Sequence, residues 1–216
     1  MALIKISSYD YWWNSGKKTR NMVRKAEKND IKTQVVEPSA KVAESIQKIY
    51  NNTPIRQERA FSHYNTPLEE VERHVLNAYR STFIGAFLEN ELTDFVQLVH
   101  GGNITVVAQI LSKQRLWDKA VNNALVAEAV EICANKKVTW LMYGRMGNHL
   151  SLDNFTESNG FSKFTLTRYY VPLKRKGKAV TTLRFHREIK DVLLQRIKSP
   201  LFPVFDWISR TKARLG

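Results

Sequence analysis

A stretch rich in directional polar groups joins two expected helices between residues 54 and 64. It contains Arg56, Arg59, His63 and Tyr64. Ordering such a loop costs conformational entropy, and surface loops of this kind often carry binding function. The two arginines suit an acceptor that bears phosphate or carboxylate, because a guanidinium group can bind such anions through two parallel hydrogen bonds. The alternative is a loop that is held only by ion pairs among its own side chains.

A basic face on the helix expected over residues 8–30 is the second candidate site. Its cations are Lys17, Lys18, Arg20, Arg24, Lys25 and Lys28. We predict that Arg20, Arg24 and Lys25 bind anions, either tRNA or lipid phosphate. The alternative is a solvated face on a protein that is basic throughout.

Several other chemistries find no support in the motifs. The five histidines show no metal-ligand spacing, and the single cysteine, Cys133, excludes an internal disulfide and a cysteine zinc site. The spacing suggests no Ser-His-Asp arrangement, and P-loop and dinucleotide fingerprints are absent. We therefore expect no metal, and we expect Cys133 to be a buried structural thiol.

Composition indicates a globular protein with a strong positive charge. The 216 residues are 43% hydrophobic and carry a formal net charge of +14, which attracts nucleic acid, anionic lipid or phosphate-bearing cofactors. Residues 1–8 lack the apolar core of a secretory signal, and no run approaches the roughly 20 apolar residues that span a bilayer. These features predict a cytoplasmic protein.

The elements that must position these residues alternate between helix and strand. Helical periodicity predicts helices over 8–30, from 39, from 66, over 119–135 and over 151–159. Extended runs predict strands over 2–6, 31–37, 82–88, 92–100, 103–111, 138–143 and 161–173. The three central runs are separated by short polar or glycine turns, which is typical of an antiparallel meander. We expect an α/β (α+β) fold with a mixed, mostly antiparallel sheet flanked by helices.

Several phrases resemble the GNAT superfamily of N-acyltransferases. The run 83–95 looks like its hairpin with an acidic turn, and 155–161 followed by 169–173 looks like its ending of helix, Gly-Phe and last strand. A narrower resemblance is to the Fem-type aminoacyl transferases, in which a basic helix similar to 20–28 precedes a strand. The likeness covers roughly residues 18–173.

The resemblance implies an N-acyltransferase in which main-chain amides of one central strand hold the acyl donor and polarise its carbonyl. The residues that it places there are Val106, Val107, Ala108, Gln109 and Ile110. The donor would be acyl-CoA or acetyl-CoA. Asn148 and His149, which follow the next strand, would contact the donor or supply a base.

This sequence departs from the family in the loop that grips the pyrophosphate. Residues 114–122 contain no glycine, whereas the family uses small residues there to present backbone N–H groups. Either the side chains of Lys113, Arg115 and Lys119 hold the pyrophosphate, or acetyl-CoA is not the donor.

The position of the family's general acid is also different. It is occupied by Thr156, whose hydroxyl is a weak acid for protonating a thiolate near pH 7. Tyr143, Tyr169 and Tyr170 are the candidate replacements.

The tail after residue 173 differs in composition from the rest. We predict a GNAT-like domain over 1–173 and a basic, amphipathic helical extension over 174–216, with a helix over 187–198. Residues 200–214 combine aromatic and basic side chains, as interfacial helices do. They are expected either to touch a membrane surface, at its inner face, or to dock on this domain or on a partner subunit.

The leading hypothesis is transfer of an acyl group, from acyl-CoA, to a small-molecule or lipid-linked amine acceptor, with a role in cell-envelope or polysaccharide biosynthesis. One alternative is an aminoacyl-tRNA-dependent transferase. Another is a catalytically inactive module of the same fold that binds RNA or anionic membrane.

Overall fold

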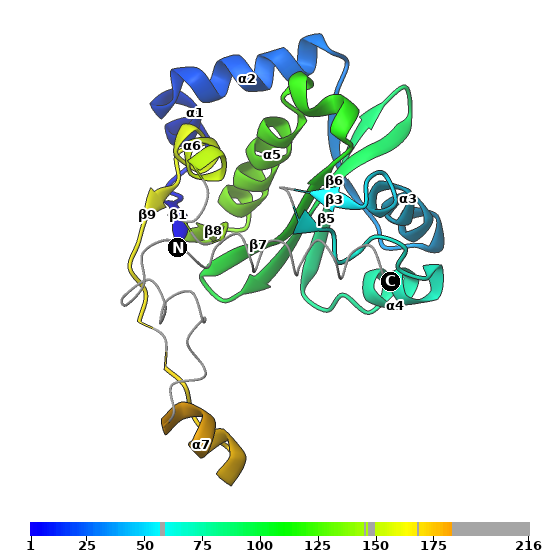
Figure 1. Cartoon of the computed structure of the whole chain (residues 1–216). Coiled ribbons are helices and arrows are strands. Elements are labelled where there is room, and N and C mark those ends of the chain that lie inside the picture. Colours follow the sequence, from blue (N-terminus) through cyan, green and yellow to red (C-terminus); the bar gives the residue numbers. More distant parts are fainter. Residues whose placement is uncertain (57–58, 145, 147–149, 168, 183–216) are drawn as a thin grey trace, which may run out of the picture. The chain divides into compact units, whose positions relative to one another are not determined.

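The computed structural model describes residues 1–56, 59–144, 146, 150–167 and 169–182 (Figure 1). The chain divides into two compact units, one of residues 1–54 and 61–165 and one of residues 55–60 and 166–216. The predicted division at residue 173 stays a prediction.

The first unit is built on a seven-stranded sheet in the order β2-β5-β6-β7-β8-β1-β9. Its strands are β1 (Ala2–Lys5), β2 (Lys32–Val36), β5 (Ser81–Leu88), β6 (Glu91–Gly101), β7 (Ile104–Ser112), β8 (Trp140–Met142) and β9 (Ser162–Lys163). The β7–β8 pair is parallel and the other pairs are antiparallel. The predicted mixed, mostly antiparallel sheet is confirmed.

Two tight turns connect the central meander. Glu89 and Asn90 both have positive φ angles, 51° and 65°, which is the type I′ turn that matches the twist of antiparallel strands. Gly102, with φ of 59°, opens the second two-residue turn, as a type II′ turn requires. The predicted three-strand meander is therefore confirmed.

Helices cover both faces of this sheet (Figure 1). One face carries α1 (Tyr9–Ser15), α2 (Lys17–Lys28), α5 (Val121–Asn135) and α6 (Leu150–Ser158). The other face carries α3 (Ala40–Tyr50) and α4 (Leu68–Leu76). None of the helices in the described residues has the length and apolar character that crossing a bilayer requires.

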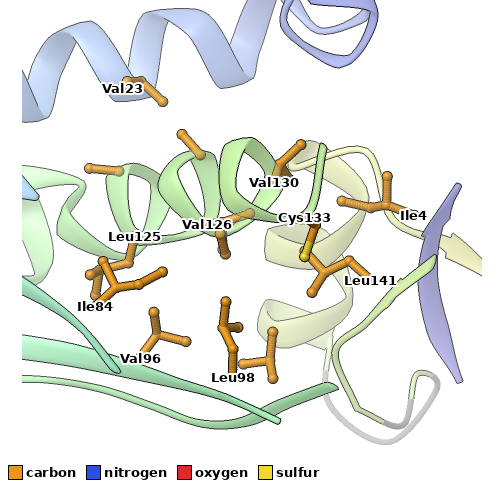
Figure 2. Packing of buried hydrophobic residues seen from close by; sticks show 14 of the residues in the cluster. Ile4, Val23, Ile84, Val96, Leu98, Leu125, Val126, Val130, Cys133 and Leu141 are labelled. Carbon is orange, nitrogen blue, oxygen red and sulfur yellow. The ribbon is translucent and has the colours of Figure 1, made fainter. Parts of the chain in front are cut away.

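The larger core is centred on α5, which is apolar around most of its surface because both of its sides are covered. Figure 2 shows Leu125 and Val126 directed toward Ile84 and Val96 of the sheet, while Val23 of α2 covers the opposite side. Cys133 is fully buried in this core, as predicted, and burial raises the pKa of its thiol.

The predicted single helix over residues 8–30 is divided in two at Gly16. The Ser8 side chain caps α1 by accepting a hydrogen bond of 3.1 Å from the Tyr11 N–H. Gly16 has extended backbone angles between the helices, and a Cβ there would lie 3.0 Å from the Thr19 hydroxyl. That hydroxyl donates to the Ser158 carbonyl, so the break lets α2 dock against α6.

The prediction of a long last strand over 161–173 is wrong. Only Ser162 and Lys163 form β9, which pairs with β1, and the described residues beyond them form no further strand. The N-terminal strand β1 occupies the place beside β8. The residues after β9 therefore cannot pair with β8, even where their side chains favour a strand.

In its described residues the second unit contains two short strands and one helix. These are β3 (Ile55–Arg56) and β4 (Arg59–Ala60), which pair with each other, and α7 (Arg175–Thr182). The helix predicted over 187–198 and the surface segment predicted over 200–214 lie outside the described residues.

Replacing Gly160 with alanine is expected to destabilise the first unit by about 1–3 kcal/mol. Gly160 has φ of 84° just beyond α6, and an added Cβ would meet the Trp12 indole nitrogen at 3.2 Å. Urea unfolding followed by circular dichroism measures the loss. The matched control is Gly101→Ala, since a Cβ at Gly101 meets nothing within 4 Å. Equal stability of the two variants would contradict the assigned role of Gly160.

Candidate functional site

The parallel strands β7 and β8 separate after three residue pairs. Their register joins Ile104–Val106 to Trp140–Met142. Beyond β8 the chain stays with β1, since the Tyr143 N–H donates to the Ala2 carbonyl (2.9 Å) and the Ala2 N–H to the Gly144 carbonyl (2.8 Å). Strand β7 continues to Ser112 paired with β6 alone. Its edge from Val107 onward thus has no strand partner on the β8 side within the described residues.

A β-bulge lies at the start of this unpaired edge. Leu98 pairs with Val107 and Gln97 with Gln109, so Ala108 is an extra residue on β7. Val107 belongs to the core under α5, whereas Gln109 points to the α3 face. In an uninterrupted strand these two residues would share a face, so the bulge reverses the alternation.

The residues around the bulge are less buried than the rest of this central strand. Ala108 is exposed, and Val106, Gln109 and Ile110 are half-buried. The side chain of Trp117, which follows in the chain, lies outside the described part.

The segment between β7 and α5 forms a tight turn without glycine. It consists of the 3-10 helix η1 (Gln114–Lys119) and Ala120, whose φ of 58° is left-handed. The Asn122 amide nitrogen donates to the Ser112 hydroxyl (3.2 Å), which fixes the start of α5 against the end of β7. The Asn122 Oδ1 atom is buried and has no hydrogen-bond partner among the described residues. At the start of α5 the N–H groups of Asn123 and Ala124 donate to the Ala120 carbonyl (3.0 and 3.4 Å), while those of Val121 and Asn122 precede the first intrahelical bond.

The three cations predicted for the pyrophosphate have different surroundings. The Lys113 ammonium is 2.5 Å from the Glu91 carboxylate, so an anion there would have to compete with Glu91. Lys119 ends η1, is half-buried, and makes no ion pair within the described residues. The Arg115 side chain lies outside the described part.

Thr156, in the place of the family's general acid, has a structural role. It is 1% exposed, and its hydroxyl lies 3.0 and 2.9 Å from the carbonyls of Leu152 and Asp153 in its own helix. It therefore has no proton to offer to a substrate.

Tyr143 is the one predicted replacement for this acid that lies in the first unit. It follows β8 directly, where that strand leaves β7, and its ring packs edge-on against Phe161 at 5.6 Å. Burial raises the pKa of Tyr143 to about 12, so the phenol keeps its proton throughout the neutral range.

The other predicted catalytic residues are Tyr169, Tyr170 and His149. Tyr169 and Tyr170 are exposed, lie outside any strand and belong to the second unit, so their catalytic role stays a prediction. Asn148 and His149 lie outside the described residues.

A polar and aromatic cluster lies on the α3–α4 face. The Tyr50 hydroxyl at the end of α3 donates to Gln109 Oε1 (2.8 Å), next to the bulge. The His63 ring stacks on Tyr50 with centroids 4.8 Å apart, and Phe61 meets both rings edge-on. The structure thus joins two predicted residues, His63 and Gln109, through Tyr50, which was not among the predicted site residues.

Two further members of this cluster were missed by the sequence analysis. Gln97, beside Gln109 on β6, is 5% exposed, and its Oε1 lies 3.0 Å from His74 Nε2 on α4. A lone amide in an otherwise apolar strand was the available clue, because buried polar side chains need a partner.

The other predicted substrate residues lie in the second unit or at the surface. Arg56 and Arg59 are directly opposite each other in the β3–β4 pair, and the Arg59 side chain lies outside the described part. Tyr64 is exposed in the following turn. Their acceptor-binding role stays a prediction.

The basic face of α2 is exposed as expected, apart from one residue. Arg24 and Lys25 point to solvent, and Val23 and Ala26 are buried. Arg20 is half-buried and donates from its guanidinium to the Trp13 carbonyl (2.8 Å). Anion binding at this surface is untested. Within the described residues, no three His, Cys, Asp or Glu side chains form a group that would hold a metal ion.

Comparison with known proteins gives the fold class. No family model matches the sequence, and no curated protein matches it. The structure is similar to FemX, with a TM-score of 0.56 and 12% identity over 74% of this chain and 58% of that one. It is also similar to a probable acetyltransferase from Staphylococcus epidermidis, with a TM-score of 0.51 and 15% identity over 62% and 85% of the two chains. A ribosomal-protein-alanine N-acetyltransferase from Brucella melitensis gives 0.50 and 11% over 67% and 99%.

These similarities define the class of the protein by its architecture. The chain has the GNAT fold, the fold of N-acetyltransferases, and its likeness extends to FemX. The resemblance drawn from the sequence is confirmed at this level. The chain spans 58% of FemX, so it corresponds to part of that protein.

Proposed function

We propose that this protein is an N-acyltransferase that moves an acyl group from acyl-CoA to a primary amine. The observation that carries the proposal is the separation of β7 from β8 at a bulge that exposes Ala108 in a GNAT-type sheet. Bulges are frequent next to active sites because they release main-chain groups from the ladder.

The residues of the unpaired edge suit a thioester donor. Acyl-CoA supplies the activated carbonyl, and the Ala108 N–H is in the part of β7 where a donor to that oxygen is needed. The pantetheine amides resemble a peptide, so they can pair with the strand edge from Val107 to Ser112. Lys119 and the N–H groups of Val121 and Asn122 at the start of α5 are available for the rest of the cofactor.

Tyr143 is the proposed proton donor to the departing thiolate. A phenol with a pKa of about 12 is a weak acid, but it is protonated at neutral pH and hydrogen-bonds a developing thiolate. It replaces the hydroxyl of Thr156, which is committed to its own helix.

Isothermal titration with acetyl-CoA and longer acyl-CoAs tests the proposal. We expect binding in the micromolar range, as is usual for enzyme substrates, and release of CoA on addition of an amine. An absence of binding at millimolar acyl-CoA would contradict the donor assignment.

The exposed cations of α2 favour a second candidate, which is transfer from aminoacyl-tRNA or binding of RNA or anionic membrane without catalysis. It predicts salt-sensitive binding of tRNA and turnover with charged tRNA. Turnover with acyl-CoA in the absence of tRNA would decide against it.

A further inference from the structure

The cluster around Tyr50 lies directly across β7 from the core that surrounds α5. Gln109 reaches it because the bulge at Ala108 reverses the strand's alternation at that point. The same bulge therefore supplies the N–H that we propose as hydrogen-bond donor to the acyl carbonyl, and it directs the Gln109 side chain toward α3 and α4.

We infer that the α3–α4 face holds the amine acceptor and that His63 accepts the proton of the attacking nitrogen. This inference rests on the proposed acyl transfer. It adds the face of the sheet from which the amine attacks and the residue that acts as the base.

The geometry holds His63 beside the reacting strand while leaving it accessible. Tyr50 covers one face of the imidazole at 4.8 Å, and Phe61 meets its ring edge-on at 5.4 Å. The Tyr50 hydroxyl is fixed to Gln109, the residue after the bulge, at 2.8 Å. His63 itself remains exposed, so a substrate nitrogen can reach it.

The electrostatic surroundings keep His63 in the form that a base needs. Partial burial lowers the pKa of His63 below its usual 6.5, and the neighbouring His74 acts in the same direction, while Glu70 opposes both. The titratable groups that surround His63 are Tyr50 on α3 and Glu70 and His74 on α4. The imidazole is consequently neutral at pH 7 and able to take a proton.

Tyr50 is a poor choice for the same task. Burial raises the pKa of Tyr50, and its hydroxyl already donates to Gln109. It keeps its proton at neutral pH.

The amine, the thioester, His63 and Tyr143 together account for every bond and proton in the reaction. The amine nitrogen forms a bond to the thioester carbon as the carbon–sulfur bond breaks. The nitrogen loses one proton to His63, and the departing thiolate takes one from Tyr143. No oxidant or reductant is involved, and the products are an amide and CoA.

The experiment measures CoA release from acetyl-CoA with a thiol reagent, between pH 5 and pH 9. The probe amines are hydroxylamine, 1,4-diaminobutane and a peptide with an N-terminal alanine. The variants are His63→Gln and, as matched control, His100→Gln. His100 also has a pKa lowered by burial and by Lys136, but it bonds Thr82 and Thr105 on the α5 side of the sheet. Titration calorimetry records acetyl-CoA binding for each protein.

For the wild type and His100→Gln we expect a rate that falls in the acid range at a pH lower than 6.5, because the lowered pKa of His63 delays its protonation until there. His63→Gln is expected to lose about 10²- to 10⁴-fold in rate and to lose this acid limb, with acetyl-CoA affinity unchanged. That result supports the inference.

Three results would overturn it. His63→Gln with an unchanged rate and acid limb would remove His63 as the base and leave the acyl transfer standing. Normal acetyl-CoA binding with no CoA release to any probe amine would remove the acceptor assignment and leave the donor site. An absence of acetyl-CoA binding in the wild type would overturn the proposed function itself and the inference with it.

Discussion

Replacing Ala108 with proline is expected to lower the rate of acyl transfer about 100- to 1,000-fold, the usual cost of removing one oxyanion donor. Proline has no N–H, so the variant removes the main-chain group that we propose polarises the acyl carbonyl. A bulge is one of the few places inside a sheet that admits proline, because the extra residue is not part of the regular ladder. The rate of CoA release at saturating acyl-CoA measures the effect.

The matched control for this variant is Ala108→Ser, which keeps the N–H and adds one small polar atom at an exposed position. It is expected to retain the wild-type rate within about threefold. Circular dichroism and thermal unfolding of both variants establish that the sheet is intact. If the proline variant folds and turns over as fast as the serine variant, the Ala108 N–H is not the donor.

Replacing Phe95 with alanine is expected to lower the free energy of unfolding by about 3–5 kcal/mol. Phe95 is 1% exposed at the centre of β6, and its ring lies 6.2 Å from that of Tyr50. Its removal leaves a cavity beneath α3 as well as a loss of buried apolar surface. Urea unfolding measures the change as a lower midpoint at an unchanged slope.

Phe87→Ala is the comparison variant, because Phe87 borders the same core but is only half-buried. We expect it to cost about half as much, since less surface leaves water at that position on folding. A larger loss of unfolding free energy for Phe87→Ala than for Phe95→Ala would show that the core between the sheet and α3 is not centred on Phe95.

Local patterns in the sequence predicted most of the first unit. Alternation and turn chemistry predicted the meander, including the turn at Glu89 and Asn90, because two-residue hairpin turns depend on neighbouring residues. The break at Gly16 and the short β9 were missed. Both depend on distant partners, namely the contact of Thr19 with α6 and the insertion of β1 beside β8.

The candidate site was predicted in part. The strand Val106–Ile110 was identified through the resemblance, and His63 through the polar character of its loop. Their connection through Tyr50 was not predictable, because Tyr50 fits the apolar period of α3 as well as any core residue does. The bulge was also hidden, since Val107, Ala108 and Gln109 contain neither glycine nor proline.

The sequence alone determined the class of fold, the positive charge, the buried thiol and the order of strands and helices. These follow from periodicity and composition, which act over a few residues at a time. Only the tertiary structure decided that β7 and β8 separate, that Ala108 is extra and that Gln109, Tyr50 and His63 meet. Each of these depends on the register between segments far apart in the chain, and a shift of one residue would turn every side chain concerned to the opposite face.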